Sequence, residues 1–370
     1  MHFSSASRTV LCLLLCAAPA ALLAGPVLEP GAANAAAAGP HVDEFLARIG
    51  QAAANGSGAG LVGLADSIAA RTDLHPAARD RLLRELALAL AQVAPDAAAR
   101  DLVTDLERRP PGVRVWLHEG HHRIDVLLYD VAAAARYTSR RWAEEAAREQ
   151  ARFALQTADT GLVDRFAAGD DTFRRGVVAA LDEVSSADLL TFRDRVATAL
   201  GDGVAVTALA LPIALRLQDR GLAATLMQHG HPALIVHALP LISAALAPAD
   251  ALAVLESALS QPGLASSALF EMGRLATAEP RARDRLFAAL DDPDLGGSAA
   301  AALAGLDDAE IAWELGRRLE SGASGLPERR ALLALRLSHT DAARVALDRF
   351  MRSPDASARL QRELPAGSAP

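Results

Sequence analysis

The sequence contains no lysine, so its 37 basic residues are all arginine. It has only two cysteines, Cys12 and Cys16, and both lie in an apolar segment near the N-terminus. If that segment is removed, the remaining chain has no thiol for a disulfide bond or for thiolate chemistry. We attribute the absence of lysine to GC-rich coding rather than to a recognition function.

Aromatic residues are also scarce, at 4% of the chain, and stretches of alternating apolar residues are almost absent. Hydrophobic residues nevertheless make up 51%, and many of them are alanine, the best helix former. This composition predicts a helical protein with enough apolar material for a core. The net charge of −8 argues against nucleic acid as a partner, because phosphate backbones need a concentrated basic surface.

The N-terminus has the pattern of a secretory signal peptide. Arg8 precedes an uncharged apolar stretch over residues 9–24, and small residues suitable for cleavage follow at Ala24 and Ala35. We favour cleavage after Ala35, because Ala33 then occupies the −3 position. The sequence therefore predicts a signal peptide over residues 1–35 and a periplasmic location, with a retained N-terminal membrane anchor as the alternative. Residues 25–40 are expected to be a tether or part of the signal.

Helical patterns and breaks divide the rest of the chain. We expect N-terminal helical hairpins over 36–112, a hairpin or loop insertion followed by long helices over 113–201, helical repeats over 202–364 and a disordered tail over 365–370. Asp130 is predicted to cap a long helix, and Ser185 to begin another with a capping box.

An internal repeat is present in the C-terminal half. Seven residues recur after 31 positions: Leu255, Leu259, Pro262, Leu264, Ser267, Ala268 and Leu275 correspond to Leu286, Leu290, Pro293, Leu295, Ser298, Ala299 and Leu306. Looser copies begin at Leu222 and Leu315. Two short helices cannot bury an apolar face alone, so neighbouring repeats are expected to stack.

Residues 286–306 resemble a HEAT repeat of the short, bilin-lyase type. They show a leucine-rich first helix, an Asp-Pro turn and an alanine-rich second helix, although Gly296-Gly297 stands where the family usually has Val-Arg. The resemblance covers about residues 220–352. It implies an all-α solenoid of stacked helical hairpins that acts as a scaffold, and by itself it implies no reaction.

The uncharged run over residues 231–249 is nearly long enough to span a membrane. Because it contains three prolines and two histidines, we expect buried central helices rather than a transmembrane segment.

The segment His118-Glu119-Gly120-His121-His122 matches H-E-x-x-H. On a helix, His118 and His122 would bind zinc, Glu119 would activate water, and Glu144 or Glu145 could be the third ligand, as in a metallopeptidase. The flanking residues 113–117 and 124–126 instead alternate as a β-hairpin does, with Glu119-Gly120 at its tip. We therefore expect no catalytic residue, metal site or cofactor here.

Two other clusters are open to a functional interpretation. His229, His231 and His237 are compatible with a metal site, but a turn with histidines at helix ends is the simpler reading. Residues 140–142 (Arg-Arg-Trp) are compatible with a recognition patch, but a solvated face with a core tryptophan is expected. The sequence as a whole predicts a scaffold that binds another protein through the concave face of its stacked helices.

Overall fold

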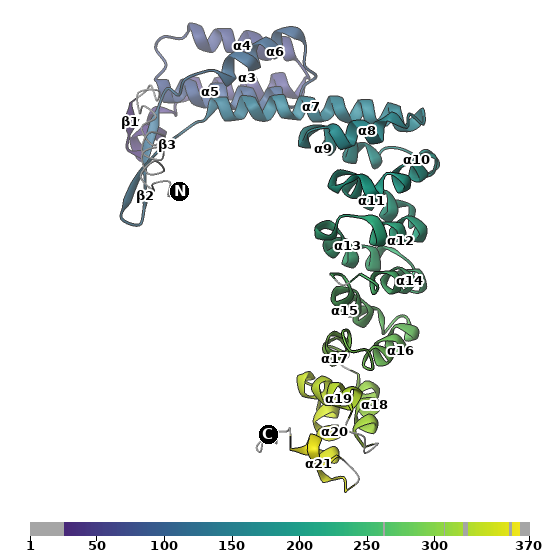
Figure 1. Ribbon diagram of the computed structural model, residues 1–370. Coiled ribbons are helices and arrows are strands. Elements are labelled where there is room, and N and C mark those ends of the chain that lie inside the picture. Colours follow the sequence, from purple (N-terminus) through teal and green to yellow (C-terminus); the bar gives the residue numbers. More distant parts are fainter. Residues whose placement is uncertain (1–25, 262, 307, 321–324, 355–356, 363–370) are drawn as a thin grey trace, which may run out of the picture. The chain divides into compact units, whose positions relative to one another are not determined.

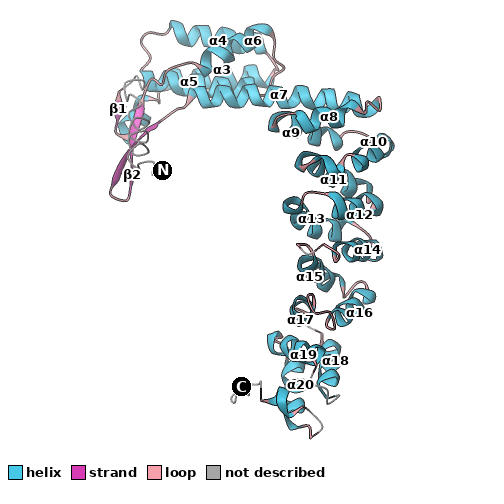
Figure 2. Ribbon diagram, viewed as in Figure 1, coloured by secondary structure: helices cyan, strands magenta, loops and turns pink. Residues whose placement is uncertain are grey.

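The computed structural model describes residues 26–370 except 262, 307, 321–324, 355–356 and 363–370. The described chain is helical apart from one three-stranded sheet (Figures 1 and 2), which confirms the expected all-α fold with a small β-hairpin insertion. It forms two compact units, one ending at Ala147 and the other beginning at Arg148. This division lies inside the expected 113–201 segment rather than at either of its ends. The cleavage position at Ala24 and the tail over 365–370 lie outside the described residues.

The described part of the first unit contains the sheet, five helices and the first part of a sixth helix, α7. Its elements are β1 (Val27–Leu28), α2 (Pro30–Ala36), α3 (Pro40–Ala54), α4 (Gly58–Ala70), α5 (Pro76–Leu90), α6 (Ala97–Glu107), β2 (Arg114–Glu119), β3 (His122–Leu127) and α7 (Val131–Gln156), which continues into the second unit. Asp130 caps α7 as predicted, because its carboxylate accepts a hydrogen bond from the Ala133 N–H at 2.7 Å.

Residues 26–37 differ from the expected tether. β1 pairs in parallel with β2, and α2 buries Ala33 and Ala37 completely against Val113 and Val115. Arg81 of α5 donates a hydrogen bond to the Ala37 carbonyl at 3.1 Å. The boundary expected after Ala35 therefore falls inside a helix that is packed into the fold. This packing could not be predicted from the sequence, because alanine-rich packing has no distinctive pattern.

Asp80 on α5 holds the start of the β-hairpin. Its carboxylate is 2% exposed and accepts hydrogen bonds from the Gly112 N–H at 2.7 Å and the Val113 N–H at 3.2 Å. Burial raises the pKa of Asp80, and the hydrogen bond from Gly112 and the charge of Arg109 oppose that rise. A side chain at Gly112 would overlap the Asp80 carboxylate, so glycine is required at this position.

The second unit is a stack of helical hairpins that follows the end of α7. Its helices are α8 (Gly161–Ala168), α9 (Asp171–Leu181), α10 (Ser186–Thr198), α11 (Val204–Leu217), α12 (Arg220–His229), α13 (Pro232–Ala245), α14 (Pro248–Ala258), α15 (Ala265–Leu275), α16 (Pro280–Ala289), α17 (Gly296–Ala304), α18 (Ala309–Glu320), α19 (Leu326–Leu337), α20 (Asp341–Arg352) and α21 (Ala358–Gln361). The capping box predicted at Ser185 begins α10.

These helices form two layers (Figure 1). Helices α11, α13, α15, α17 and α19 pack on one another in sequence and form the first layer; α10, α12, α14, α16, α18 and α20 form the second layer. In the second layer, successive helices begin at residues 186, 220, 248, 280, 309 and 341; in the first, they begin at 204, 232, 265, 296 and 326. The intervals between successive starts are 28 to 34 residues, and they lie around the offset of 31 in the sequence.

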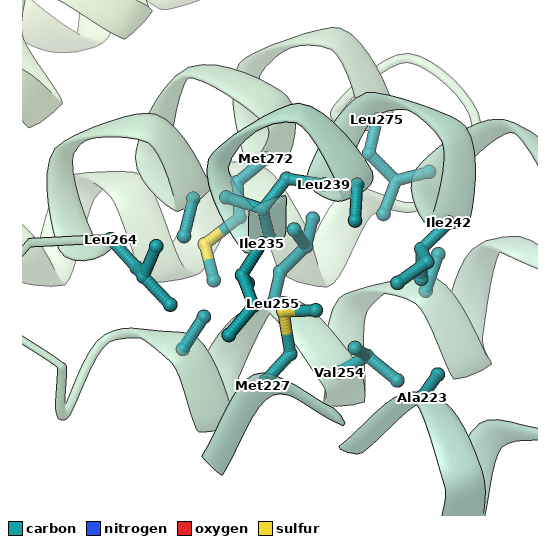
Figure 3. Packing of buried hydrophobic residues seen from close by; sticks show 14 of the residues in the cluster. Ala223, Met227, Ile235, Leu239, Ile242, Val254, Leu255, Leu264, Met272 and Leu275 are labelled. Atoms are coloured by element: carbon teal, nitrogen blue, oxygen red, sulfur yellow. The ribbon is translucent and has the colours of Figure 1, made fainter. Parts of the chain in front are cut away.

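One continuous core runs through the second unit. Figure 3 shows part of it, where Met227 of α12, Ile235 and Leu239 of α13, Leu255 of α14 and Met272 of α15 meet. Residues one repeat apart occupy matching buried positions: Leu255 and Leu286 are both 0% exposed, as are Ala268 and Ala299. The pairs Leu259 and Leu290, and Leu275 and Leu306, also recur after 31 positions, but their burial is less uniform. Leu275 and Leu290 are buried, whereas Leu259 and Leu306 are partly buried at the edge of the cluster.

Candidate interaction surface

The H-E-x-x-H segment lies on a β-hairpin and not on a helix. β2 and β3 are antiparallel, and Glu119 pairs with His122 across a two-residue turn. Gly120 has a φ of 60° at the first position of this turn, while His121 has an ordinary negative φ, which is the pattern of a type II′ turn. The alternation read from the sequence is confirmed.

The hairpin places His118 and His122 on opposite faces of the sheet. His118 lies opposite Arg123, and His122 lies opposite Glu119, so the two histidines are out of phase by one residue. The zinc motif requires both imidazoles on one face of a helix. His118 and His122 therefore cannot bind one zinc ion in the way that the motif requires. Glu144 lies on α7, where its carboxylate is 3.3 Å from Arg141. Within the described part of the chain, no three His, Cys, Asp or Glu residues are grouped to hold a metal ion.

The two other clusters considered in the sequence, residues 140–142 and the histidines near residue 230, do not form a site. Their residues lie on helices or at helix ends. The Trp142 indole donates hydrogen bonds to the carbonyls of Leu90 and Val93 at 3.1 and 3.0 Å, and its ring packs against the core of the first unit, as expected. His229 ends α12, and His231 precedes α13 and donates its backbone N–H to Thr207.

The second layer of the second unit carries ion pairs that connect neighbouring hairpins. The pairs join residues 26 to 31 positions apart, or about one repeat: Arg195 with Asp164, Arg193 with Asp219, Arg220 with Asp250, Arg285 with Glu256, Arg283 with Glu310, Arg318 with Asp291 and Arg349 with Glu320. Many charged side chains of this layer therefore form ion pairs between neighbouring hairpins. Each exposed pair stabilises little, but together they favour one stacking register.

In the first layer, three neighbouring helices expose apolar side chains and carry few charges. Val204 on α11, Val236 and Leu241 on α13 and Phe270 on α15 are 48, 37, 51 and 47% exposed. We call these four residues the apolar face. Helix α13 has no charged residue, and the only one on α11 is Arg216, whose guanidinium donates to the Val184 carbonyl. Helix α15 carries Glu271 and Arg274, and Arg274 is exposed one turn from Phe270.

The second layer also exposes large apolar residues, but these lie on helices rich in charged residues: Leu190 on α10, Trp313 on α18, and Val345 and Met351 on α20. We take the apolar face as the candidate interaction site, because interaction sites are often rich in large exposed apolar residues.

This face corrects the expectation for residues 231–249. They were expected to form buried central helices, but α13 is buried on one side only, through Ile235, Leu239 and Ile242. No helix in the described ranges has both the length and the apolar character to cross a membrane. The sequence of α13 contains no Asp, Glu, Lys or Arg, and this absence of charge was the only sign of an exposed apolar side. It favoured burial as the prediction, because an exposed helix side without charged residues is uncommon.

An open groove near the C-terminal end of the second unit is lined mainly by charged residues, unlike the apolar face. It has a volume of about 730 Å³ and is lined by α18 and α20, including Glu320, Asp348, Arg349 and Arg352. Its charges neutralise one another locally, since Arg349 lies 2.8 Å from Glu320. We regard the apolar face as the better candidate for an interaction site.

Comparison with known proteins finds no match: no family model, no curated protein and no solved structure is similar to this chain.

Proposed function

We propose that this protein is an exported helical-repeat scaffold that binds another protein through the apolar face. The observation that carries the proposal is the low charge of α11 and α13 beside their exposed apolar side chains. Many charged side chains of the second layer are engaged between hairpins, whereas α11, α13 and α15 present exposed Val204, Val236, Leu241 and Phe270 without charged neighbours on α11 and α13. An aromatic and aliphatic centre with few charges is the composition of an interface core.

The chemistry of the face favours an uncharged apolar segment as the bound part of the partner. A charged side chain placed against Val236 and Leu241 would lose its hydration without gaining an opposite charge. An amphipathic helix whose apolar side lies along α13 fits this requirement, as in other complexes in which a helix docks on a hydrophobic surface.

Two prolines add backbone acceptors to this face. Pro212 lies inside α11 and Pro240 inside α13. Proline has no N–H, so the carbonyls of Ala208 and Val236, four residues earlier, receive no helical hydrogen bond from these positions. Both residues are exposed. A partner that carries hydroxyl or amide donors beside its apolar residues would use these carbonyls, which makes recognition more specific than apolar contact alone.

The resemblance to HEAT repeats and the apolar N-terminal segment support the other parts of the proposal. Helix starts that recur every 28 to 34 residues suit a short HEAT-like repeat. Because β1 and α2 pack into the first unit, we place the end of the signal peptide before Pro26, near Ala24, instead of after Ala35.

The proposal is tested with aspartate substitutions on the two layers. Val236→Asp and Leu241→Asp place a charge on the apolar face, and Leu190→Asp places the same charge at a 55% exposed position on α10 in the other layer. Proteins retained by the immobilised wild-type chain from the cells that produce it should be lost with the first two variants and kept with the third. Equal retention by all three would overturn the proposal.

A further inference from the structure

Strand β3 has a free edge. The sheet order is β1-β2-β3, so in the described chain β3 (His122–Leu127) has a strand neighbour on one side only. The strand pairs with β2 in regular register over six residues and contains neither a bulge nor a proline. Such an edge presents unpaired backbone N–H and C=O groups to a further strand.

The hairpin also carries an apolar pair that the described part of the chain leaves exposed. Leu117 and Ile124 lie directly opposite each other, on the same face as the buried Val115 and its partner Val126. The base of this face is packed with α2, but Leu117 and Ile124 are 48 and 39% exposed. The distal half of the hairpin therefore combines an unpaired edge with an uncovered apolar pair.

We propose that two copies of this chain associate by antiparallel pairing of their β3 strands, centred on Ile124. The charges of the strand select this register. With Ile124 opposite the partner's Ile124, Arg123 lies opposite the partner's Asp125, and Asp125 opposite the partner's Arg123. A register centred on Arg123 or on Asp125 would instead place identical charges opposite each other, which is destabilising.

The pairing also covers the apolar pair. In the resulting six-stranded sheet, Leu117, Ile124, the partner's Ile124 and the partner's Leu117 form one row across the same face, because directly opposite residues share a face. Apolar contact in this row and backbone hydrogen bonds along the edge supply the attraction. A slip by one residue would move Ile124 to face a charged residue, so the register is specified.

Both charged residues already have contacts within the chain, and these contacts allow the new pairs. Arg123 lies 3.1 Å from Glu29 and stacks over Trp116, but the Arg123 and Glu29 side chains are 48 and 67% exposed. An exposed ion pair of this kind is worth little and is readily exchanged. Asp125 is paired with Arg114, and a carboxylate accepts from two guanidinium groups. The charges therefore set the register, while the backbone and the apolar row provide the affinity.

The absence of other cysteines allows a direct test. A chain that begins at Gly25 lacks Cys12 and Cys16, so a single introduced cysteine is its only thiol. Opposite residues in an antiparallel pair have Cα atoms about 4.5–5.5 Å apart, within the range of a disulfide. Ile124→Cys should therefore form a covalent dimer on mild oxidation. Leu117→Cys is the matched control, since it is exposed on the same face but lies about 14 Å from its counterpart, three strand spacings away.

A charge exchange provides the second measurement, with circular dichroism confirming that each variant is folded. Wild type is expected to sediment as a dimer. Arg123→Asp should weaken the dimer by about tenfold or more, because the registers centred on residues 123, 124 and 125 then all place like charges opposite each other. Arg123→Asp combined with Asp125→Arg should regain part of this affinity, since the exchange restores the pairs between copies but removes those with Glu29 and Arg114 within the chain. Monomeric wild type at all concentrations without a disulfide in Ile124→Cys would overturn the proposal. Equal crosslinking of the two cysteine variants would do the same, as would crosslinking of Ile124→Cys to a different protein in place of its own copy.

Discussion

The guanidinium group of Arg330 fills the space in which a side chain at Gly296 would lie. Arg330 is 8% exposed and donates hydrogen bonds to the Leu290 carbonyl at 2.7 Å and the Pro293 carbonyl at 2.6 Å. It also donates to the Asp292 carbonyl. A residue from the start of α19 thus holds the turn that connects α16 to α17. This accounts for glycine at position 296, because a side chain there would overlap Arg330.

This contact predicts that substitutions at Gly296 and Arg330 change the free energy of unfolding in a non-additive way. Gly296→Val should lower the free energy of unfolding by about 1–3 kcal/mol through overpacking, and Arg330→Met by a similar amount because three carbonyls lose their donor. The double variant should cost less than the sum, since methionine vacates part of the space. A double-mutant cycle from urea unfolding measures this coupling, and additive effects would contradict the contact.

Leu290 and Arg285 test the repeat register. Leu290 is 0% exposed in the core, so Leu290→Ala should cost about 2–5 kcal/mol. Arg285 is half-exposed and lies 3.8 Å from Glu256, so Arg285→Ala should cost less than about 0.5 kcal/mol. Unfolding followed by circular dichroism gives both values. Equal shifts in the unfolding midpoint would show that the register is wrong.

Asp219 predicts a pH-dependent contribution to the second unit. It caps α12 through the Leu222 N–H at 2.9 Å and pairs with Arg193 at 2.6 Å. Burial acts to raise the pKa of Asp219, but the hydrogen bonds from Arg193 and Leu222 outweigh it and hold the pKa below its usual range. A lowered folded-state pKa means that this stabilisation is present above the unfolded pKa of about 3.9 and is lost as the pH falls through the folded value.

Asp219→Asn should therefore cost about 1–3 kcal/mol at neutral pH, and the difference from wild type should shrink below about pH 3.9. Asp194 is the matched control. It also contacts Arg193, at 2.7 Å, but it is 81% exposed and caps no helix, so Asp194→Asn should have little effect at any pH. Urea midpoints measured from neutral to acidic pH test this, and a constant difference for Asp219→Asn would contradict the assigned role.

The packing of β1 and α2 predicts where the mature chain begins. Removing residues through Ala35 would delete β1 and Ala33 and expose Val113 and Val115. A chain that starts at Gly25 should therefore unfold at a higher urea concentration than one that starts at Ala36. The intact mass of the protein isolated from the cells that produce it gives the natural start directly. A mature chain beginning at Ala36 would contradict this placement.

The sequence and the structure agree where periodicity or capping chemistry is strong. The 31-residue offset, the Asp130 cap and the alternation around Glu119-Gly120 all predicted what the structure contains. Features that depend on long-range packing were missed. The role of Gly296 depends on Arg330, 34 residues away, and the packing of Ala33 depends on β2. The exposed side of α13 was missed because low charge alone does not distinguish a buried side from an apolar surface.

Site-specific photo-crosslinking tests the central claim of a protein-binding apolar face most directly. A photoreactive amino acid is placed at Leu241 or Phe270 on the apolar face, or at Leu190 on the other layer, and the cells that produce the protein are irradiated. All three positions are about half exposed, so nonspecific collision should label them alike. We predict one discrete adduct with the same protein from Leu241 and Phe270, and none from Leu190. Equal labelling at all three positions, or no adduct from Leu241 and Phe270, would contradict the account.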